Sequence, residues 1–444
     1  MPMLSQNSPI AFRARLPEKV DVVIIGAGII GISTAWFLIK NGLSVLVCEK
    51  GRVGGEQSTR NWGWVRQMGR DEAELPIATE SLSIWENLAS EIDEDVGFSR
   101  KGLLFLAENE KNLKEFEEWM EIAKQYQLDT QILSASELGK KLNYTEHRWK
   151  GAMYTPSDGR AEPFIAVPAI ARAAQRAGAR IIENCAARTI ETQAGAVSGV
   201  ITELGAVRAR AVVCASGVWS SAFLANLGVS FPQLLVKGTV VRTSAVSEAF
   251  SGGAGSDKFS FRRRQDGGYT LSLGNYVDHY LGADSFRYFA DFLPALKMTW
   301  SAIRLRYDDG LLKRLFPTRR WKGDEITPFE QTRVLNPMPN PRVARKIQQL
   351  MASNLPILAK AQIKEVWAGM IDAPPDFVPV MDEIPNYRNL FLATGFSGHG
   401  FGIGPGAGKI MATLVQGKQA KFDLNRFRFS RFSDGSPITP GPAL

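Results

Sequence analysis

Three glycines and one glutamate near the start of the chain have the types and spacing needed to bind a dinucleotide. Gly26, Gly28 and Gly31 follow the pattern G-x-G-x-x-G. In this pattern the first glycine permits a tight turn, the second lets backbone approach a pyrophosphate, and the third lets a helix pack closely on a strand. Glu49 follows at the distance where a carboxylate accepts hydrogen bonds from a ribose 2′-hydroxyl and repels a 2′-phosphate. NADP is therefore disfavoured.

The elements that must position these residues are visible in the same stretch. The β-branched run 20–25 predicts a buried strand, and apolar residues recur at helical spacing over 32–39 before Gly42 ends the pattern. Residues 44–48 predict a second strand that ends at Glu49. A complete β-α-β unit favours dinucleotide binding over a simple tight turn, with the phosphates at the helix N-terminus.

Later segments predict further strands of the same sheet. Residues 164–177 predict a helix, and 180–182 and 211–214 predict strands, the second of which runs into the small-residue turn 215–219. Another strand, 390–393, leads into the glycine-dense loop 394–408 and a helix expected over 409–415. We expect the helix start at Gly404–Gly408 to present N–H groups to an anionic cofactor ring; the alternative is a flexible surface loop.

Together these motifs resemble the D-amino acid oxidase superfamily of flavoproteins, over about residues 20 to 420. Within it, the chain is similar to bacterial L-amino acid deaminases of the Proteus type, on residues 55–60, 184–188 and 191–195 and a long helical insertion at about 280–355. The superfamily marks are Gly26-x-Gly28-x-x-Gly31, Glu49, Ala215-x-Gly217-x-Trp219, Trp367-x-Gly369, Asp376-x-x-Pro379 and Gly395-x-x-x-His399-Gly400.

The resemblance implies FAD as cofactor and a mixed α/β (α+β) fold. It implies a Rossmann-like FAD-binding domain of the glutathione-reductase type and a substrate domain with a large, mostly antiparallel sheet. The expected FAD-binding segments are 19–95, 155–230 and 360–425; the substrate-binding segments are 96–154 and 231–359, and 1–18 and 426–444 are tails. The cofactor-binding residues implied are Gly26, Gly28, Gly31, Glu49, Ser58, Thr59, Arg60, Ala187, Gly217, Trp219, Gly369, Gly395, Gly400, Phe401 and Gly402.

The residue that binds the substrate carboxylate is harder to place. Many superfamily members carry an arginine just after Trp-x-Gly, where this chain has Met370 and Ile371. Residues 259–273 predict a hairpin, in which Arg263 shares a face with Phe261, and Arg262 lies on the other face. If the Phe261 face looks toward the flavin, Arg263 is the carboxylate clamp, because a guanidinium pairs with both oxygens. A solvated edge is the alternative.

Two more residues are candidates near the reacting atoms. Trp64 lies in a polar and aromatic stretch that should run beside the isoalloxazine, as a pocket wall or as packing between domains. His399 lies in the glycine loop and is expected to hydrogen-bond flavin or substrate, or to have a structural role only. No protein base is required, since a desolvated pocket lowers the pKa of the substrate ammonium.

The expected reaction is oxidative deamination of an L-α-amino acid to the imino and then keto acid, by hydride transfer to flavin N5. Oxygen, which would yield H₂O₂, and a quinone are both open as electron acceptors. One alternative is the same chemistry on a D-amino acid or a secondary amine such as sarcosine. Another is an electron-carrying flavoprotein subunit.

Composition limits the remaining possibilities. The net charge of +8 favours anionic partners, but the basic residues are spread out and no nucleic-acid-binding module is present. Three cysteines without paired spacing indicate a reducing, cytoplasmic location, and three scattered histidines argue against a metal site. No transmembrane segment is expected, because Asp21 and glycines interrupt the apolar stretch 20–39. The insertion could be a lid, a partner surface or a peripheral membrane contact, and the oligomeric state is open.

Overall fold

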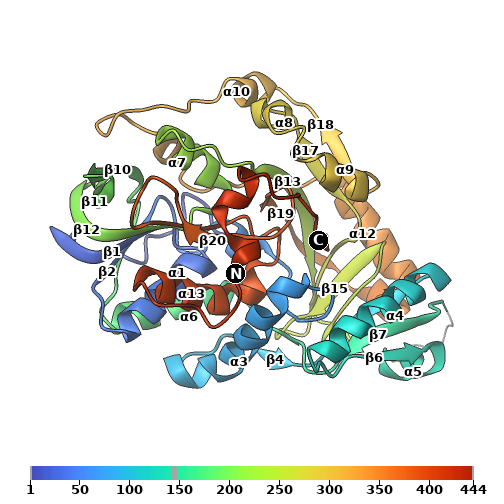
Figure 1. Cartoon of the computed structure of the whole chain (residues 1–444). Coiled ribbons are helices and arrows are strands. Elements are labelled where there is room, and N and C mark those ends of the chain that lie inside the picture. The colour runs from blue at the N-terminus through green and yellow to red at the C-terminus, as the bar shows by residue number, and fades with distance from the viewer. Residues whose placement is uncertain (1–2, 143–147, 443–444) are drawn as a thin grey trace.

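The computed structural model describes residues 3–142 and 148–442, arranged around two large β-sheets that lie side by side (Figure 1). One sheet has eight strands and the other ten, with a small three-stranded sheet beside them. The mixed α/β fold expected from the sequence is confirmed.

The eight-stranded sheet holds the β-α-β unit. Strand β1 (Lys19–Ile25) lies between β2 (Val45–Glu49) and β12 (Gly205–Cys214), and all three are parallel. The carboxyl ends of these strands therefore meet at one edge, where ligands of such sheets bind. The other strands are β9 (Arg180–Glu183), β10 (Ala187–Gln193), β11 (Ala196–Thr202), β20 (Val380–Glu383) and β21 (Leu390–Thr394).

Helices cover one face of this sheet. The inward side chains alternate along β1, so that Val22 and Ile24 face the helices and Val23 packs on the opposite side. Both sets are buried, as the unbroken apolar pattern of the strand requires. The covering helices are α1 (Ile29–Lys40), α3 (Leu75–Ile92), α6 (Pro163–Arg176) and α13 (Gly400–Val415).

The expected helix over 409–415 is corrected in one respect, because α13 begins nine residues earlier, at Gly400. Gly404–Gly408 lie inside the helix and are not its start. A side chain at Gly404 would lie 2.7 Å from Ile29 of α1, and one at Gly406 would lie 2.8 Å from the Ile77 carbonyl of α3. These glycines therefore serve close helix packing, and the helix start that faces the cofactor region is 399–402.

The ten-stranded sheet is mostly antiparallel. Its hairpin of β15 (Phe259–Arg263) and β16 (Tyr269–Leu273) has the expected register. Strand β19 (Ile363–Ala373) pairs with β13 (Leu234–Thr243) in this sheet, although β19 falls within the segment 360–425 expected to bind FAD. The domain boundaries stay a prediction. The remaining strands are β5 (Leu103–Ala107), β6 (Gln131–Ser134), β7 (Gly151–Thr155), β14 (Gly253–Gly255), β17 (Val277–Tyr280) and β18 (Ile303–Arg306).

The insertion is not purely helical, because β18 pairs in parallel with β17. Helix α12 (Pro341–Asn354) packs its buried face, Val343, Ile347 and Met351, on the second sheet. The other insertion helices are α8 (Ala283–Arg287), α9 (Leu293–Thr299), α10 (Leu311–Leu315) and α11 (Pro328–Gln331).

The smaller elements complete the fold. Among the described residues no helix is both long and apolar enough to cross a bilayer. The three-stranded sheet consists of β3 (Trp64–Val65), β4 (Ser99–Arg100) and β8 (Gly159–Arg160), and the other helices are α2 (Gln57–Arg60), α4 (Glu110–Gln125), α5 (Ala135–Lys141) and α7 (Ser220–Asn226).

Candidate functional site

The turn between β1 and α1 leaves no room for side chains. Gly26 has φ +102°, and a Cβ there would lie 2.6 Å from the Ala215 carbonyl oxygen. A Cβ on Gly28 would lie 2.9 Å from Ser58 Oγ, and one on Gly31 would collide with the carbonyl of Gly26. The turn thus brings bare backbone to the N-terminus of α1, as a phosphate-binding turn requires.

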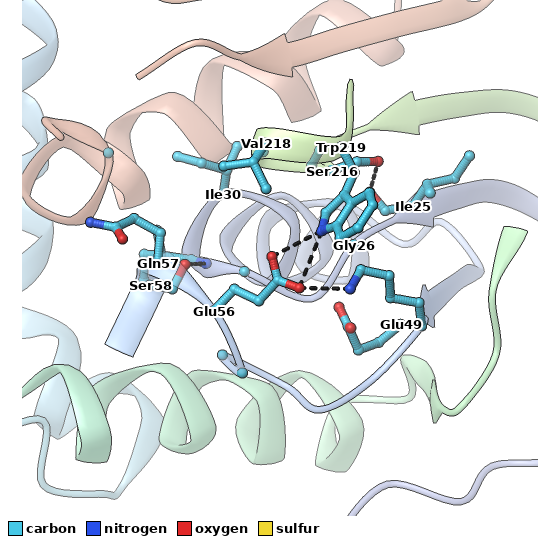
Figure 2. Close-up of a pocket in the computed structure, with 18 of the residues that line it drawn as sticks. Ile25, Gly26, Ile30, Glu49, Glu56, Gln57, Ser58, Ser216, Val218 and Trp219 are labelled. Carbon is cyan, nitrogen blue, oxygen red and sulfur yellow. Dashed lines mark hydrogen bonds and ion pairs between the residues drawn. The ribbon is translucent and has the colours of Figure 1, made fainter. Parts of the chain in front are cut away.

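A cavity opens at this edge of the sheet, and we call it the cradle cavity (Figure 2). It extends from the glycine turn past the end of β2 to the turn after β12 and the start of α13. Glycines line its wall, and any larger residue at these positions would place its side chain in the cavity. The space left by the glycines fits the adenosine and pyrophosphate part of FAD. The expected cofactor residues in its lining are Gly26, Gly28, Glu49, Ser58, Ala187, Gly217, Trp219, Gly400 and Phe401.

Glu49 is held at the end of β2 by backbone hydrogen bonds. Its carboxylate accepts from the Ala27 N–H at 2.8 Å and from the Gly51 N–H at 2.7 Å. Burial nevertheless raises the pKa of Glu49 to about 7. Each carboxylate oxygen of Glu49 can accept a second hydrogen bond. A ribose hydroxyl that donated one would favour the ionised form of Glu49.

Trp219 forms another wall of the cradle cavity. Its Nε1 donates to the Glu56 carboxylate at 3.0 Å, and Lys50 Nζ pairs with the same carboxylate at 2.6 Å (Figure 2). These contacts hold the indole ring in the wall of the cradle cavity.

The other expected cofactor residues lie outside the cradle cavity. Thr59 donates to the Gly54 carbonyl, and the Gly395 N–H donates to Asp372 at 2.7 Å. A side chain at Gly402 would lie 2.9 Å from the Trp64 carbonyl, so this glycine lets α13 approach β3. Gly31 is a packing position, and Arg60 and Gly369 line a second cavity instead.

The second cavity, which we call the aromatic cavity, encloses about 560 Å³ and shares Gln57, Asn61, Gly398 and Phe401 with the cradle cavity. The shared residues mark where the two meet, which is where a flavin ring attached to the cradled half would face a substrate. Its aromatic wall consists of Trp62, Trp64, Phe105, Phe116 and Trp119.

Buried polar atoms without a partner among the described residues gather in the lining of the aromatic cavity. They include Arg70 Nε and Nη1, Trp64 Nε1, His399 Nε2 and the acceptor Gln57 Oε1. Buried polar groups are normally hydrogen-bonded, so these atoms are available to a polar ligand or to water in the cavity.

Arg70 is the most telling of them. It is 3% exposed, and the charges of Glu74 and Asp158 act on it, but its Nε and Nη1 have no hydrogen-bond partner in the described part of the chain. Burial lowers the pKa of Arg70, as it does for its neighbour Arg66, which donates to the Met68 carbonyl and lies over the Phe105 ring. Because a guanidinium stays protonated in proteins, Arg70 is a buried cation with free donors, which suits a carboxylate ligand.

The hairpin arginines do not reach either cavity. Phe261 packs in the apolar core beneath α12 and lines neither cavity, so the condition under which Arg263 would be the carboxylate clamp finds no support in the packing. Arg263, on that face, lies over the Tyr269 ring and donates to the Val246 carbonyl at 2.9 Å. The opposite face supplies Ser260 to the aromatic cavity.

Arg262 lies on the Ser260 face but is covered. It is 1% exposed and makes two hydrogen bonds to Glu162, at 2.7 and 3.1 Å, besides one to the Trp62 carbonyl. All three hairpin arginines thus have protein partners, since Arg264 pairs with Asp266. Their position supports structural roles.

Removing the partner of Arg262 is expected to destabilise the fold. Glu162→Gln should lower the free energy of unfolding by about 3–5 kcal/mol, because it leaves a buried cation without its counter-charge. Chemical denaturation measures this. Glu94→Gln is the control, since Glu94 pairs with the exposed Arg172 and Arg176 and should cost about 1 kcal/mol or less. Equal losses in the two variants would contradict a buried structural pair.

Sequence reasoning missed Arg70 and Glu74. Glu74 is fully buried and lies 3.0 Å from His399 Nδ1. A signal for them was available in the sequence. Arg66 and Arg70 lie shortly after Trp64, a residue already expected beside the cofactor, and shortly before the apolar helix α3. Within the described residues, no cluster of three or more His, Cys, Asp or Glu could hold a metal ion.

Comparison with known proteins places this geometry in context. The model of a family described as FAD dependent oxidoreductase matches residues 21–414. L-Amino acid deaminase from Proteus myxofaciens, solved in complex with anthranilate, is 30% identical with a TM-score of 0.92, over 98% of this chain and 100% of that one. The deaminase from Proteus vulgaris is 28% identical with a TM-score of 0.90, over 97% and 100%.

A curated relative is more distant. Human mitochondrial sarcosine dehydrogenase is 26% identical over 435 residues, which are 94% of this chain but 42% of that protein. The chain thus spans about two fifths of the length of this relative.

Proposed function

The chain belongs to the family of FAD-dependent oxidoreductases, and from this premise we propose that it deaminates an L-α-amino acid oxidatively. The product would be an imino acid, which water converts to the keto acid. The observation that carries the proposal is the guanidinium of Arg70, whose Nε and Nη1 have no partner among the described residues, in a cavity that joins the cradle cavity.

Each end of an amino acid has a counterpart in the aromatic cavity. Arg70 would bind the carboxylate in place of the expected Arg263, because no described residue accepts a hydrogen bond from its Nε or Nη1. Trp62, Phe116 and Trp119 would contact a large apolar or aromatic side chain. The anthranilate in the Proteus myxofaciens deaminase is itself an aromatic carboxylate, which supports this choice.

Bound FAD would supply the hydride acceptor, and the chain would supply binding and orientation. The cradle glycines and Glu49 would hold the adenosine half. The dense aromatic wall would exclude water from the α-carbon, and Arg70 would fix the carboxylate so that the α-C–H has one orientation.

A secondary amine such as sarcosine is the competing substrate, since relatives include sarcosine dehydrogenase. The deaminase structures match this chain end to end, whereas the sarcosine dehydrogenase match spans 42% of that protein. This difference favours the L-amino acid. A D-amino acid and an electron-carrying role are further outcomes of the test below.

The test is anaerobic mixing of the purified yellow protein with single candidates. We expect L-phenylalanine or L-leucine to bleach the flavin absorbance, and D-phenylalanine, sarcosine and NADH to leave it unchanged. Bleaching by sarcosine alone would show that the substrate is a secondary amine and not an L-α-amino acid. Bleaching by NADH alone would indicate an electron carrier. Adding oxygen or a soluble quinone to the bleached protein, with peroxide measured in parallel, identifies the acceptor.

We also propose that the insertion touches a lipid surface, where a membrane quinone would be at hand. Elements α8, α9, β18 and α10 lie together along one border of the molecule (Figure 1). Large apolar side chains are exposed there, and residues 281–326 carry nine lysines and arginines against six acidic residues. Exposed apolar groups among cations suit an anionic bilayer. The exposed residues are Phe286, Phe289, Trp300, Tyr307, Leu312 and Phe316.

Vesicle sedimentation checks this proposal. The protein should sediment with vesicles that contain anionic phosphatidylglycerol and stay in solution with phosphatidylcholine alone. The double variant Trp300→Ser with Phe316→Ser should lose most of the bound fraction. Leu204→Ser, which removes an exposed side chain outside the insertion, is the control. No binding of the unaltered protein to anionic vesicles would contradict the proposal.

A further inference from the structure

A buried carboxylate and imidazole form a pair at the wall of the aromatic cavity. Glu74 lies just before α3 and His399 just before α13, 325 residues apart in sequence. Their atoms Oε2 and Nδ1 are 3.0 Å apart, and both side chains are almost completely buried. Helix packing thus brings them together, and the pair has no part in the function proposed so far.

The protonation of the pair follows from its surroundings. Burial, and then the charge of Arg70, lowers the pKa of His399 to about 4, so the ring is neutral at pH 7. Although burial opposes it, His399 and Arg70 hold the pKa of Glu74 below its usual value, so this carboxylate is ionised. An ionised carboxylate requires a donor, so the ring proton lies on Nδ1. Nε2 then carries a lone pair.

That lone pair has no partner. Nε2 is buried and receives no hydrogen bond from the described residues, while His399 lines the aromatic cavity beside Gly398 and Phe401. Gly398 and Phe401 also line the cradle cavity, so the imidazole stands where the two cavities meet. In the same cavity, Arg70 offers donors for an anion, and His399 offers an acceptor for a cation. An α-amino acid zwitterion carries both groups, a carboxylate for Arg70 and an ammonium for His399.

We propose that His399 Nε2 accepts the proton of the substrate ammonium and that Glu74 orients the ring for this transfer. The proposal rests on the proposed function and deepens it. The ammonium proton moves to Nε2 and leaves a neutral amine and an imidazolium paired with Glu74. Bound FAD would supply the acceptor for the α-hydrogen, which leaves as hydride, so that the amine becomes an iminium, and the imidazolium returns its proton to water.

The coupling to substrate is electrostatic. The charged groups that face His399 are Glu74, Arg70 and Arg66, and both arginines lower its pKa. A carboxylate bound at Arg70 cancels one of these positive charges, so the pKa of His399 should rise on binding by about one unit or more. The base is therefore weaker in the free protein and stronger when a carboxylate is bound at Arg70.

Histidine NMR on the FAD-bound protein tests the coupling without turnover. Benzoate is the probe, because it carries a carboxylate and an aromatic ring but no amine. With ¹³C,¹⁵N-histidine labelling, the pKa of His399, identified by loss of its signal in His399→Gln, should rise by about one unit or more at saturating benzoate. His279 is the matched control, since its ring nitrogens already contact Leu235 O at 2.8 Å and Ser285 Oγ at 2.9 Å. An unchanged pKa for His399 with benzoate bound would overturn the coupling.

Flavin reduction tests the proton transfer. His399→Gln should keep FAD and benzoate binding but slow anaerobic reduction at pH 7 by about 10²-fold or more, and regain rate as pH rises and free amine becomes available. His279→Gln should reduce at the rate of the unaltered protein. Glu74→Gln, a change in a positioning residue, should shift the pH profile of reduction in the same direction.

The two levels of the proposal fail separately. If no amino acid reduces the unaltered protein, the proposed function fails, while the benzoate titration still reports on Arg70 and His399. If the unaltered protein is reduced and His399→Gln is reduced equally fast at pH 7, the assignment of His399 falls while the function stands.

Discussion

Replacing Arg70 with methionine should raise the KM for an L-amino acid by about 100-fold or more, because hydrogen bonds to a charged partner contribute about 1.5–3 kcal/mol each and two donors are lost. Arg70 Nε and Nη1 have no partner among the described residues, so little else depends on them. Steady-state kinetics measure the KM, and the FAD content of the variant should equal that of the unaltered protein.

Arg263→Met is the matched control. It removes a guanidinium of the same size that lies over Tyr269 and lines neither cavity, so the KM should stay within about twofold of the original. Arg70→Lys should recover part of the loss, since a lysine keeps the charge but not the planar pair of donors. If Arg263→Met raised the KM as much as Arg70→Met, the hairpin would be the carboxylate site after all.

Replacing Gly28 with valine should give a folded but colourless protein, with affinity for FAD lowered by about 100-fold or more, because the side chain would fill the space that backbone and pyrophosphate share. Gly28 has φ −74°, which any residue adopts, so the change strains no backbone torsion, and the Ser58 side chain is the group that must shift for the fold to tolerate it. A Cβ at this position already lies 2.9 Å from Ser58 Oγ. Circular dichroism checks the fold, and flavin fluorescence titration checks the affinity.

Gly238→Ala is the control for this experiment. Its added Cβ would meet Ile371 at 3.8 Å, an ordinary contact, and Gly238 lies in β13, in the lining of the aromatic cavity but outside the cradle cavity that would hold the pyrophosphate. It should bind FAD like the unaltered protein. A yellow Gly28→Val variant with unchanged FAD affinity would show that the β1–α1 turn does not hold the pyrophosphate.

Much of the cofactor-binding half could be predicted from the sequence, because its signals are local. Local patterns predicted β1, α1 and β2 to within a few residues. These patterns are the β-branched run before Gly26, the glycine spacing, and Glu49 at the end of the next strand. Gly217 and Trp219 follow β12 directly, so their place at the same edge followed from parallel pairing. The start of α13 was not predicted, because a run of glycines in a sequence is typical of a loop. Here the glycines allow α13 to pack closely on α1 and α3, which only the folded structure shows.

The substrate side was decided by the tertiary structure. Alternation fixed which residues share a face of the β15–β16 hairpin, but α12, some eighty residues later, decided that the Phe261 face is covered. Arg262 contacts Glu162, and His399 contacts Glu74, only because the packing of helices and sheets brings these distant parts of the chain together. The sequence by itself determined the strands, the turn and the cofactor class, which depend on neighbours in the chain. Which arginine stays without a partner depends on every charge that folding brings near it, and only the packed structure contains that information.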